Sequence, residues 1–82
     1  MRAEIVATLY PELRPGIYRH YKGNLYQVLE VARHSETEEW FVVYRPLYGE
    51  RGLWIRPLAM FTERVQWSGE SVERFRYERE VE

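Results

Sequence analysis

The sequence contains no cysteine, so disulfide bonds and thiolate metal sites are excluded as stabilising features. The spacing of its histidines and acidic residues matches no known metal-binding motif, and we expect neither a metal ion nor another cofactor. The first sixteen residues, MRAEIVATLYPELRPG, carry acidic positions and no long apolar run. They resemble neither a signal peptide nor a membrane span, so we expect a cytoplasmic protein without a membrane partner.

An excess of basic charge is also missing. Twelve basic residues oppose 13 acidic ones, and the net charge is −1, which argues against a general attraction to nucleic acid. The charge balance does not exclude a local basic patch. Every basic residue except Lys22 is an arginine. Arginine stacks on rings and grips carboxylate or phosphate with two hydrogen bonds, although genome composition would produce the same bias.

What the chain does have is aromatic residues, which make up 16% of its 82 positions. A chain of this length forms one domain and buries only about 60–65% of its unfolded surface, so rings must supply much of the core. We expect an N-terminal arm (1–14), a single β domain (15–77) and a charged tail (78–82). Pro11 and Pro15 limit any helix in the arm to about two turns; the arm either packs on the domain or docks a partner.

From Gly16 onward, the apolar pattern has the period of two that is typical of strands. Gly23-Asn24 predicts a tight turn, because both residues tolerate positive φ. The apolar phase switches between Val28 and Leu29, which predicts a bulge or sharp bend. The predicted strands are 16–22, 25–34, 39–48, 53–56, 65–67 and 72–77, with a hairpin loop at 35–38, a turn at 68–70 and a helical or 3₁₀ turn at 58–61.

About five to six short strands, tight turns and one helical turn predict an all-β fold. We expect a small SH3-like, strongly bent and partly open β-barrel. An OB-like barrel is the alternative, but it normally has a helix between its middle strands, and none is evident.

Four segments resemble the signature of a small bacterial family of unknown function, DUF1653. In order they are G-x-Y-R-H-Y-K-G, A-x-H-S-E-T, V-V-Y-R-x-L-Y-G and L-W-x-R-P-x-x-M-F, within residues 14–77. The resemblance implies a compact β domain and no particular activity. The positions that it singles out are His20, Tyr21, Lys22, Tyr26, His34, Ser35, Glu36, Thr37, Tyr44, Tyr48, Trp54, Arg56, Met60 and Phe61.

The segment Y-R-H-Y-K predicts a basic aromatic strip. If Ile17 and Tyr21 face the core, alternation places Tyr18, His20 and Lys22 on the outer face. Such a strip suits anionic or planar ligands and single-stranded nucleic acid. An ordinary exposed strand face, with the lysine stem covering rings, fits the pattern equally well.

In G-L-W-I-R-P, we expect Leu53 and Ile55 to face inward, so that Trp54 and Arg56 share the outer face. A large exposed ring marks a contact site. The alternative is that the arm or the loop 49–52 covers Trp54.

The loop H-S-E-T supplies a base, a hydroxyl and a carboxylate. A nucleophilic site needs these groups to meet in a chain of hydrogen bonds, which neighbours in an extended segment rarely achieve. The loop therefore either satisfies its own backbone groups or forms the rim of a recognition surface.

The sequence favours a non-catalytic binding module for a protein segment or a small anionic ligand. Nucleic-acid binding is one alternative, and a small enzyme using His34 or His20 with Glu36 as an acid–base pair is another. No catalytic residue is assigned, and the oligomeric state is left open. The candidate ligand-binding residues are Tyr18, His20, Lys22, His34, Ser35, Glu36, Thr37, Tyr48, Trp54 and Arg56.

Overall fold

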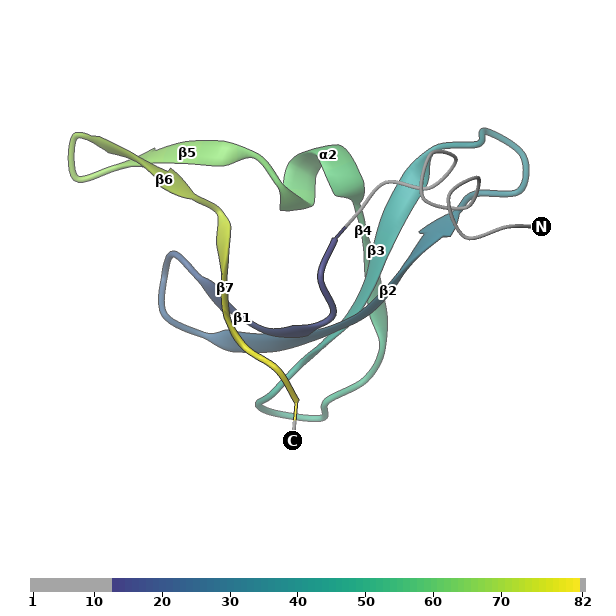
Figure 1. Cartoon of the computed structure of the whole chain (residues 1–82), viewed down its shortest axis with the longest axis horizontal. Coiled ribbons are helices and arrows are strands. Elements are labelled where there is room, and N and C mark those ends of the chain that lie inside the picture. The colour runs from purple at the N-terminus through teal and green to yellow at the C-terminus, as the bar shows by residue number, and fades with distance from the viewer. Residues whose placement is uncertain (1–12, 82) are drawn as a thin grey trace.

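The computed structural model describes residues 13–81. These residues form seven short antiparallel strands and one helical turn. Five strands make one sheet in the order β4-β3-β2-β1-β7, and β5 and β6 form a separate hairpin (Figure 1). The elements are β1 (Gly16–His20), β2 (Leu25–Arg33), β3 (Trp40–Pro46), β4 (Trp54–Pro57), α2 (Leu58–Phe61), β5 (Arg64–Trp67), β6 (Glu70–Glu73) and β7 (Phe75–Arg79).

The five-stranded sheet is strongly curved (Figure 1). Its edge strands β4 and β7 come close enough for the guanidinium carbon of Arg56 to lie 5.5 Å from the ring centre of Phe75. Their backbones do not pair, so no closed barrel forms within residues 13–81. The all-β prediction is confirmed, and so is the short helical turn at 58–61.

Two bulges shape the sheet. The β2–β3 register shifts between Val28 and Glu30, which confirms the irregularity predicted from the apolar phase switch. A second shift in the β1–β7 pairing lies between Ile17 and Tyr18. Because of it, both residues are buried, and the prediction that Tyr18 faces outward is wrong.

The core lies between the concave face of the sheet and α2. Phe61, from α2, stacks on Phe75 of β7 and touches Tyr18 of β1 edge to face. A four-residue helical turn thereby fills the open side of the curved sheet. The buried cluster comprises Tyr18, Val28, Val42, Tyr44, Phe61 and Phe75.

The faces of β4 are the reverse of those predicted. Trp54 pairs with Tyr44 and Arg56 pairs with Val42, and cross-strand partners share a face. Since Tyr44 and Val42 are core residues, Trp54 and Arg56 lie on the inner face, at its open end. The inward placement predicted for Leu53 and Ile55 is wrong, because their exposed fractions are 58% and 62%.

The C-terminal strands also differ from prediction. The single strand expected at 72–77 is two strands, β6 and β7, separated at Arg74, and β7 runs two residues further, to Arg79. The turn before β6 is formed by Ser68 and Gly69, both with positive φ, while Glu70 already belongs to β6.

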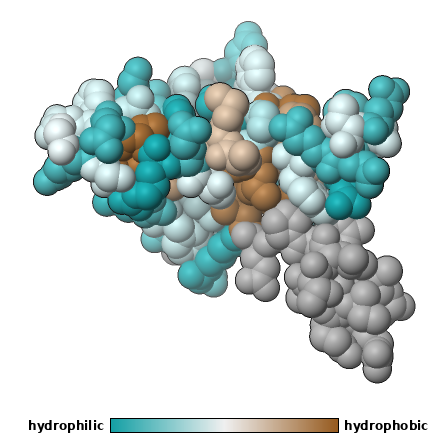
Figure 2. Space-filling model, turned by 90° about the horizontal axis from the view of Figure 1, so that it is seen from above, coloured by the Kyte–Doolittle hydropathy of each residue, from teal (hydrophilic) through white to brown (hydrophobic). Residues whose placement is uncertain are grey.

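The surface seen from the side of α2 has an apolar area in its middle, with polar areas to either side (Figure 2). The expectation of a short helix in the arm lies outside the described residues. Within residues 13–81, no helix is long and apolar enough to cross a membrane.

Candidate functional site

A groove of about 440 Å³ opens at the end of the inner face where the loop between β3 and β4 begins. Four aromatic side chains, one arginine and the loop backbone form its walls. Its lining residues are Tyr26, Tyr44, Pro46, Tyr48, Gly49, Glu50, Gly52, Trp54 and Arg56, and we call it the aromatic groove.

Tyr26 is the centre of the ring contacts in the aromatic groove. Its ring lies edge to face against Tyr44 at 5.6 Å and against Tyr48 at 5.9 Å between centroids. The hydroxyls of Tyr26 and Tyr48 are hydrogen-bonded at 3.0 Å. Burial, together with this hydrogen bond, raises the pKa of Tyr26 to about 12, so its hydroxyl keeps its proton at neutral pH.

Two rings of the groove are strongly exposed. The exposed fraction is 60% for Trp54 and 49% for Tyr48. Trp54 comes from β4 and Tyr48 from the loop after β3, and both rings line the groove. Apolar ring surface is therefore open to solvent within a concavity.

Arg56 is the cationic group of the aromatic groove. Its Nε donates to the hydroxyl of Tyr44 at 3.4 Å, and its guanidinium lies over Phe75. Among residues 13–81, no carboxylate oxygen lies within 4.0 Å of its nitrogens. Its charge is therefore available for a carboxylate or phosphate of a ligand.

The structure brings together three of the sequence-predicted residues, Tyr48, Trp54 and Arg56, in the aromatic groove. His20 lies nearby with its ring 4.9 Å from that of Phe75, but it lines a different pocket. Partial burial, and then the positive charges of neighbouring basic residues, Arg56 first, lower the pKa of His20.

Tyr18 and Lys22 lie outside the groove. Tyr18 is a core residue whose hydroxyl donates to the carbonyl of Arg14 at 2.7 Å. Lys22 lies in the exposed β1–β2 turn, with its ammonium 5.8 Å from the ring centre of Tyr21. The alternating strip inferred for this segment therefore does not form a continuous surface.

The H-S-E-T loop joins β2 to β3 at the opposite end of these strands from the β3–β4 loop (Figure 1), whose first residues line the aromatic groove. His34 Nδ1 accepts hydrogen bonds from the backbone N–H groups of Glu36 at 3.1 Å and Thr37 at 3.2 Å. The hydroxyl of Thr37 accepts from the N–H of Glu39, and Ser35 lies in the same exposed turn. These contacts are local loop bonding, so the loop is not the rim of this groove.

Sequence reasoning left Tyr26 and Tyr44 out of the recognition surface. Both are among the positions that the family resemblance singles out, which was an available signal. Their common site depends on the register of β2 against β3, because Val28 pairs with Tyr44 and Tyr26 with Pro46. That register includes the bulge and cannot be read from spacing alone.

A metal site is not evident in the described part of the chain, where no group of three or more His, Asp or Glu side chains could hold an ion. The groove instead offers ring surface, one cation, tyrosine hydroxyls and the carboxylate of Glu50. These groups bind and orient a ligand, whereas none of them forms an acid–base pair with a neighbour.

Comparisons with known proteins agree on one family. The family model DUF1653, described as a protein of unknown function, matches residues 16–77. A solved crystal structure of a protein belonging to DUF1653 from Bordetella bronchiseptica is 41% identical in sequence, with a TM-score of 0.77. The match covers 87% of this chain and 94% of that chain. No curated protein matches.

Proposed function

Since the chain belongs to the DUF1653 family, whose function is unknown, we propose from the geometry of the site that the protein is a cytoplasmic, non-catalytic binding module. It holds an extended protein segment in the aromatic groove. The observation that carries this proposal is the pair of exposed rings, Trp54 and Tyr48, that line the groove.

The groove suits an extended segment for a physical reason. Aromatic rings offer large contact areas with few rotatable bonds, so little entropy is lost when they are covered. Grooves lined by several rings dock extended or polyproline-type segments, which are already ordered before binding. Proline or aliphatic side chains of such a segment would cover Trp54, Tyr48 and Tyr26.

Charge adds a second requirement for the ligand. Arg56 lines the groove without a carboxylate partner among residues 13–81, so we infer that the bound segment carries an acidic side chain. A small anion alone would satisfy Arg56 but would leave the exposed rings uncovered.

We also propose that the fold is related to the SH3-like barrel. The curved sheet, closed off by α2 rather than by strand pairing, is an open relative of the SH3-like barrel. Barrels of that type hold ligands in ring-lined grooves between loops. This analogy is one of fold and carries less weight than the rings themselves.

An enzyme based on a His–Glu pair finds less support. General acid–base chemistry needs the imidazole within hydrogen-bond reach of its partner. In the described part of the chain, neither His20 nor His34 has a carboxylate oxygen within 4.0 Å. Instead, His20 Nδ1 accepts from the N–H of Lys22, and His34 Nδ1 accepts from its own loop.

The test is selection of a displayed random peptide library on the immobilised full chain. We expect enrichment of peptides that combine an acidic residue with proline or aliphatic residues. Trp54→Ala with Arg56→Gln should lose these peptides. Leu53→Ala with Ile55→Ala changes exposed side chains just before β4 and on its outer face, with exposed fractions close to that of Trp54, and should retain them. Failure to enrich any motif, or equal retention by the Trp54/Arg56 variant, would refute the proposal.

A further inference from the structure

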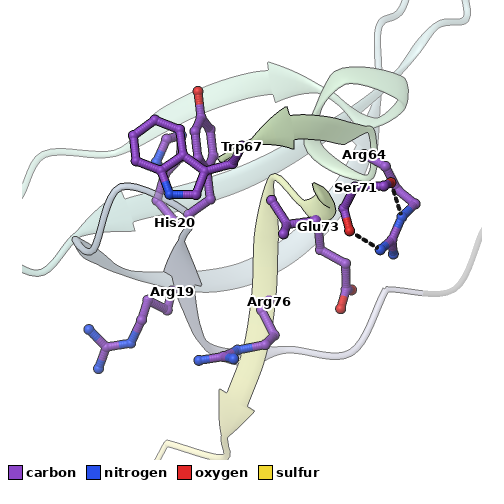
Figure 3. A pocket seen from close by; sticks show the side chains of 9 residues that line it. Arg19, His20, Arg64, Trp67, Ser71, Glu73 and Arg76 are labelled. Atoms are coloured by element: carbon purple, nitrogen blue, oxygen red, sulfur yellow. Dashed lines mark hydrogen bonds between the residues drawn. The ribbon is translucent and has the colours of Figure 1, made fainter. Parts of the chain in front are cut away.

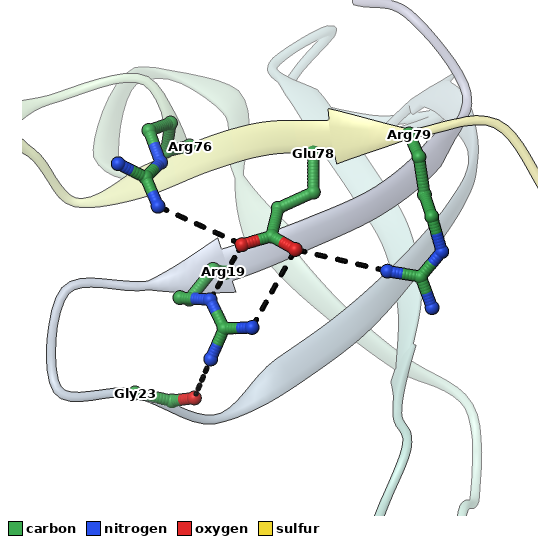
Figure 4. A network of polar contacts seen from close by, with 5 residues as sticks. All are labelled: Arg19, Gly23, Arg76, Glu78 and Arg79. Carbon is green, nitrogen blue, oxygen red and sulfur yellow. Dashed lines mark hydrogen bonds and ion pairs between the residues drawn. The ribbon is translucent and has the colours of Figure 1, made fainter.

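An unusual pairing of like charges occurs where β1 meets β7. Arg19 and Arg76 are directly opposite each other in the antiparallel ladder. Like charges at opposed positions destabilise a sheet unless a counter-charge is present. Glu78 supplies one, with its Oε1 2.5 Å from Arg19 Nε and 3.6 Å from Arg76 Nη2 (Figure 4).

Glu78 does not balance the cluster. Its other oxygen, Oε2, is 3.7 Å from Arg79 Nη1 (Figure 4), so one carboxylate faces three guanidinium groups and leaves an excess of two positive charges. The hydrogen bond from Arg19 lowers the pKa of Glu78, which keeps the carboxylate ionised at neutral pH. The surplus is therefore a fixed feature of this surface.

Arg19 and Arg76 also line a pocket of about 350 Å³ between β1, β7 and the β5–β6 hairpin. Figure 3 shows Trp67 in the upper part of the view and the side chains of Arg19 and Arg76 in the lower part, with the guanidinium of Arg19 directed away from Trp67. Trp67 is 48% exposed, and its ring contacts Tyr21 edge to face at 5.2 Å. We call this cavity the arginine pocket.

The remaining wall of the arginine pocket carries one charge of each sign. Arg64 donates from Nε to the hydroxyl of Ser71 at 2.9 Å and from Nη2 to its carbonyl at 2.8 Å. Among residues 13–81, Glu73 is the one carboxylate that lines the pocket. With Glu78 and Arg79 included, four arginines oppose two glutamates in a chain whose net charge is −1. The pocket is thus a local site of positive charge with an aromatic wall.

We propose that the arginine pocket binds a nucleoside phosphate. The phosphate oxygens accept hydrogen bonds from Arg76 and from the remaining N–H groups of Arg19, whose planar groups match phosphate geometry. Arg19 already donates from Nη1 to the carbonyl of Gly23 at 2.9 Å and from Nε and Nη2 to Glu78. The base stacks on the exposed indole of Trp67. The same chemistry is offered by a free nucleotide and by a nucleotide within a single strand. Of the described residues, none lines both this pocket and the aromatic groove, so the two proposals are independent.

The probes are AMP, GMP, CMP and UMP, with adenosine and inorganic phosphate as the separate parts and hexathymidylate as the strand. Binding to the full chain is followed by NMR through the indole N–H signal of Trp67, which Trp67→Phe identifies. We expect nucleotides to shift this signal with a Kd at or below about 1 mM and to bind more tightly than adenosine or phosphate. If a mononucleotide binds as tightly as hexathymidylate, the ligand is a free nucleotide. If hexathymidylate binds at least about tenfold more tightly than the mononucleotides, and salt weakens its binding, the ligand is a single strand.

Three variants separate the pocket from general charge. Arg19→Gln with Arg76→Gln should weaken nucleotide binding at least about tenfold, whereas Glu78→Gln, which removes the competing carboxylate, should strengthen it severalfold. Arg33→Gln with Arg45→Gln removes the same charge elsewhere and should leave the Kd within about twofold. The proposal is overturned if no probe shifts Trp67, if inorganic phosphate binds as tightly as AMP, or if both double variants lose equal affinity.

Discussion

The rings of Phe61 and Phe75 stack with their centroids 4.0 Å apart and their planes 1° from parallel. Phe61 comes from a helical turn of four residues, and Phe75 begins the last strand. This contact joins the helical turn to an edge of the sheet. It is a packing interaction on the side of the fold where no strand within residues 13–81 closes the sheet.

Phe61→Ala should lower the free energy of unfolding by about 3–5 kcal/mol, because the ring is buried and a cavity would remain. That is a large part of the total stability expected for a small domain. Met60→Ala in the same helical turn is the matched control; Met60 is exposed, and its loss should stay below about 1 kcal/mol. Denaturant unfolding of both variants provides the measurement, and equal losses would contradict this view of the core.

Gly16→Ala tests the close approach of β1 and β7. Gly16 has φ +147°, and a Cβ there would lie 2.7 Å from the carbonyl oxygen of Arg79 and 2.8 Å from Cε1 of Tyr77. Strain and overpacking together should cost about 2–5 kcal/mol.

Gly23→Ala serves as the control for that substitution. Gly23 also has positive φ, but a Cβ there meets no atom within 4 Å, so only the backbone term of about 1–2 kcal/mol should appear. The difference between the two variants in denaturant unfolding measures the steric contact. If Gly23→Ala proves as costly as Gly16→Ala, the close approach contributes nothing.

Local signals in the sequence predicted most of the strands. The turn at Gly23-Asn24 is indicated by its residue types, and the bulge after Val28 is indicated by the switch in apolar phase. The bulge between Ile17 and Tyr18 has no such signal in the sequence, because both residues are apolar and the pattern is compatible with burial of either face of the strand. The buried position of Tyr18 therefore follows from the pairing with β7, which is distant in sequence.

The candidate site shows the same division. Trp54 was predicted as an exposed ring from its local context. The face on which it lies could not be predicted, because β4 is only four residues long and carries an apolar residue on each face. Arg19 and Arg76 face each other only through a pairing of distant strands, so composition and spacing gave no sign of the arginine pocket.

His20 should make stability depend on pH. Partial burial, followed by nearby positive charges, lowers its pKa in the folded state below the ordinary value of 6.5. Between these two values the unfolded chain binds more protons, so the contribution of His20 is fully present above about pH 6.5 and is lost as the pH falls toward the folded pKa. We expect the free energy of unfolding to decrease from about pH 7.5 to pH 5.

The slope of that profile is the readout for His20. His20→Gln should flatten it in this pH range whatever its effect on total stability, while His34→Gln keeps His20 and should retain the slope. His20 and His34 are the two histidines of the chain, so the two variants together test every histidine. A slope unchanged in His20→Gln would show that another group titrates.

Trp54 and Arg56 share a face of β4 but should differ in what they contribute to the fold. Trp54 is 60% exposed, so Trp54→Ala should cost less than about 1 kcal/mol. Arg56 is less exposed, lies over Phe75 and donates to Tyr44, so Arg56→Ala should cost about 1–2 kcal/mol. Denaturant unfolding of each variant decides between a ligand-contact role and a structural one. A large loss for Trp54→Ala would place that ring in the core and remove the exposed wall on which the aromatic groove depends.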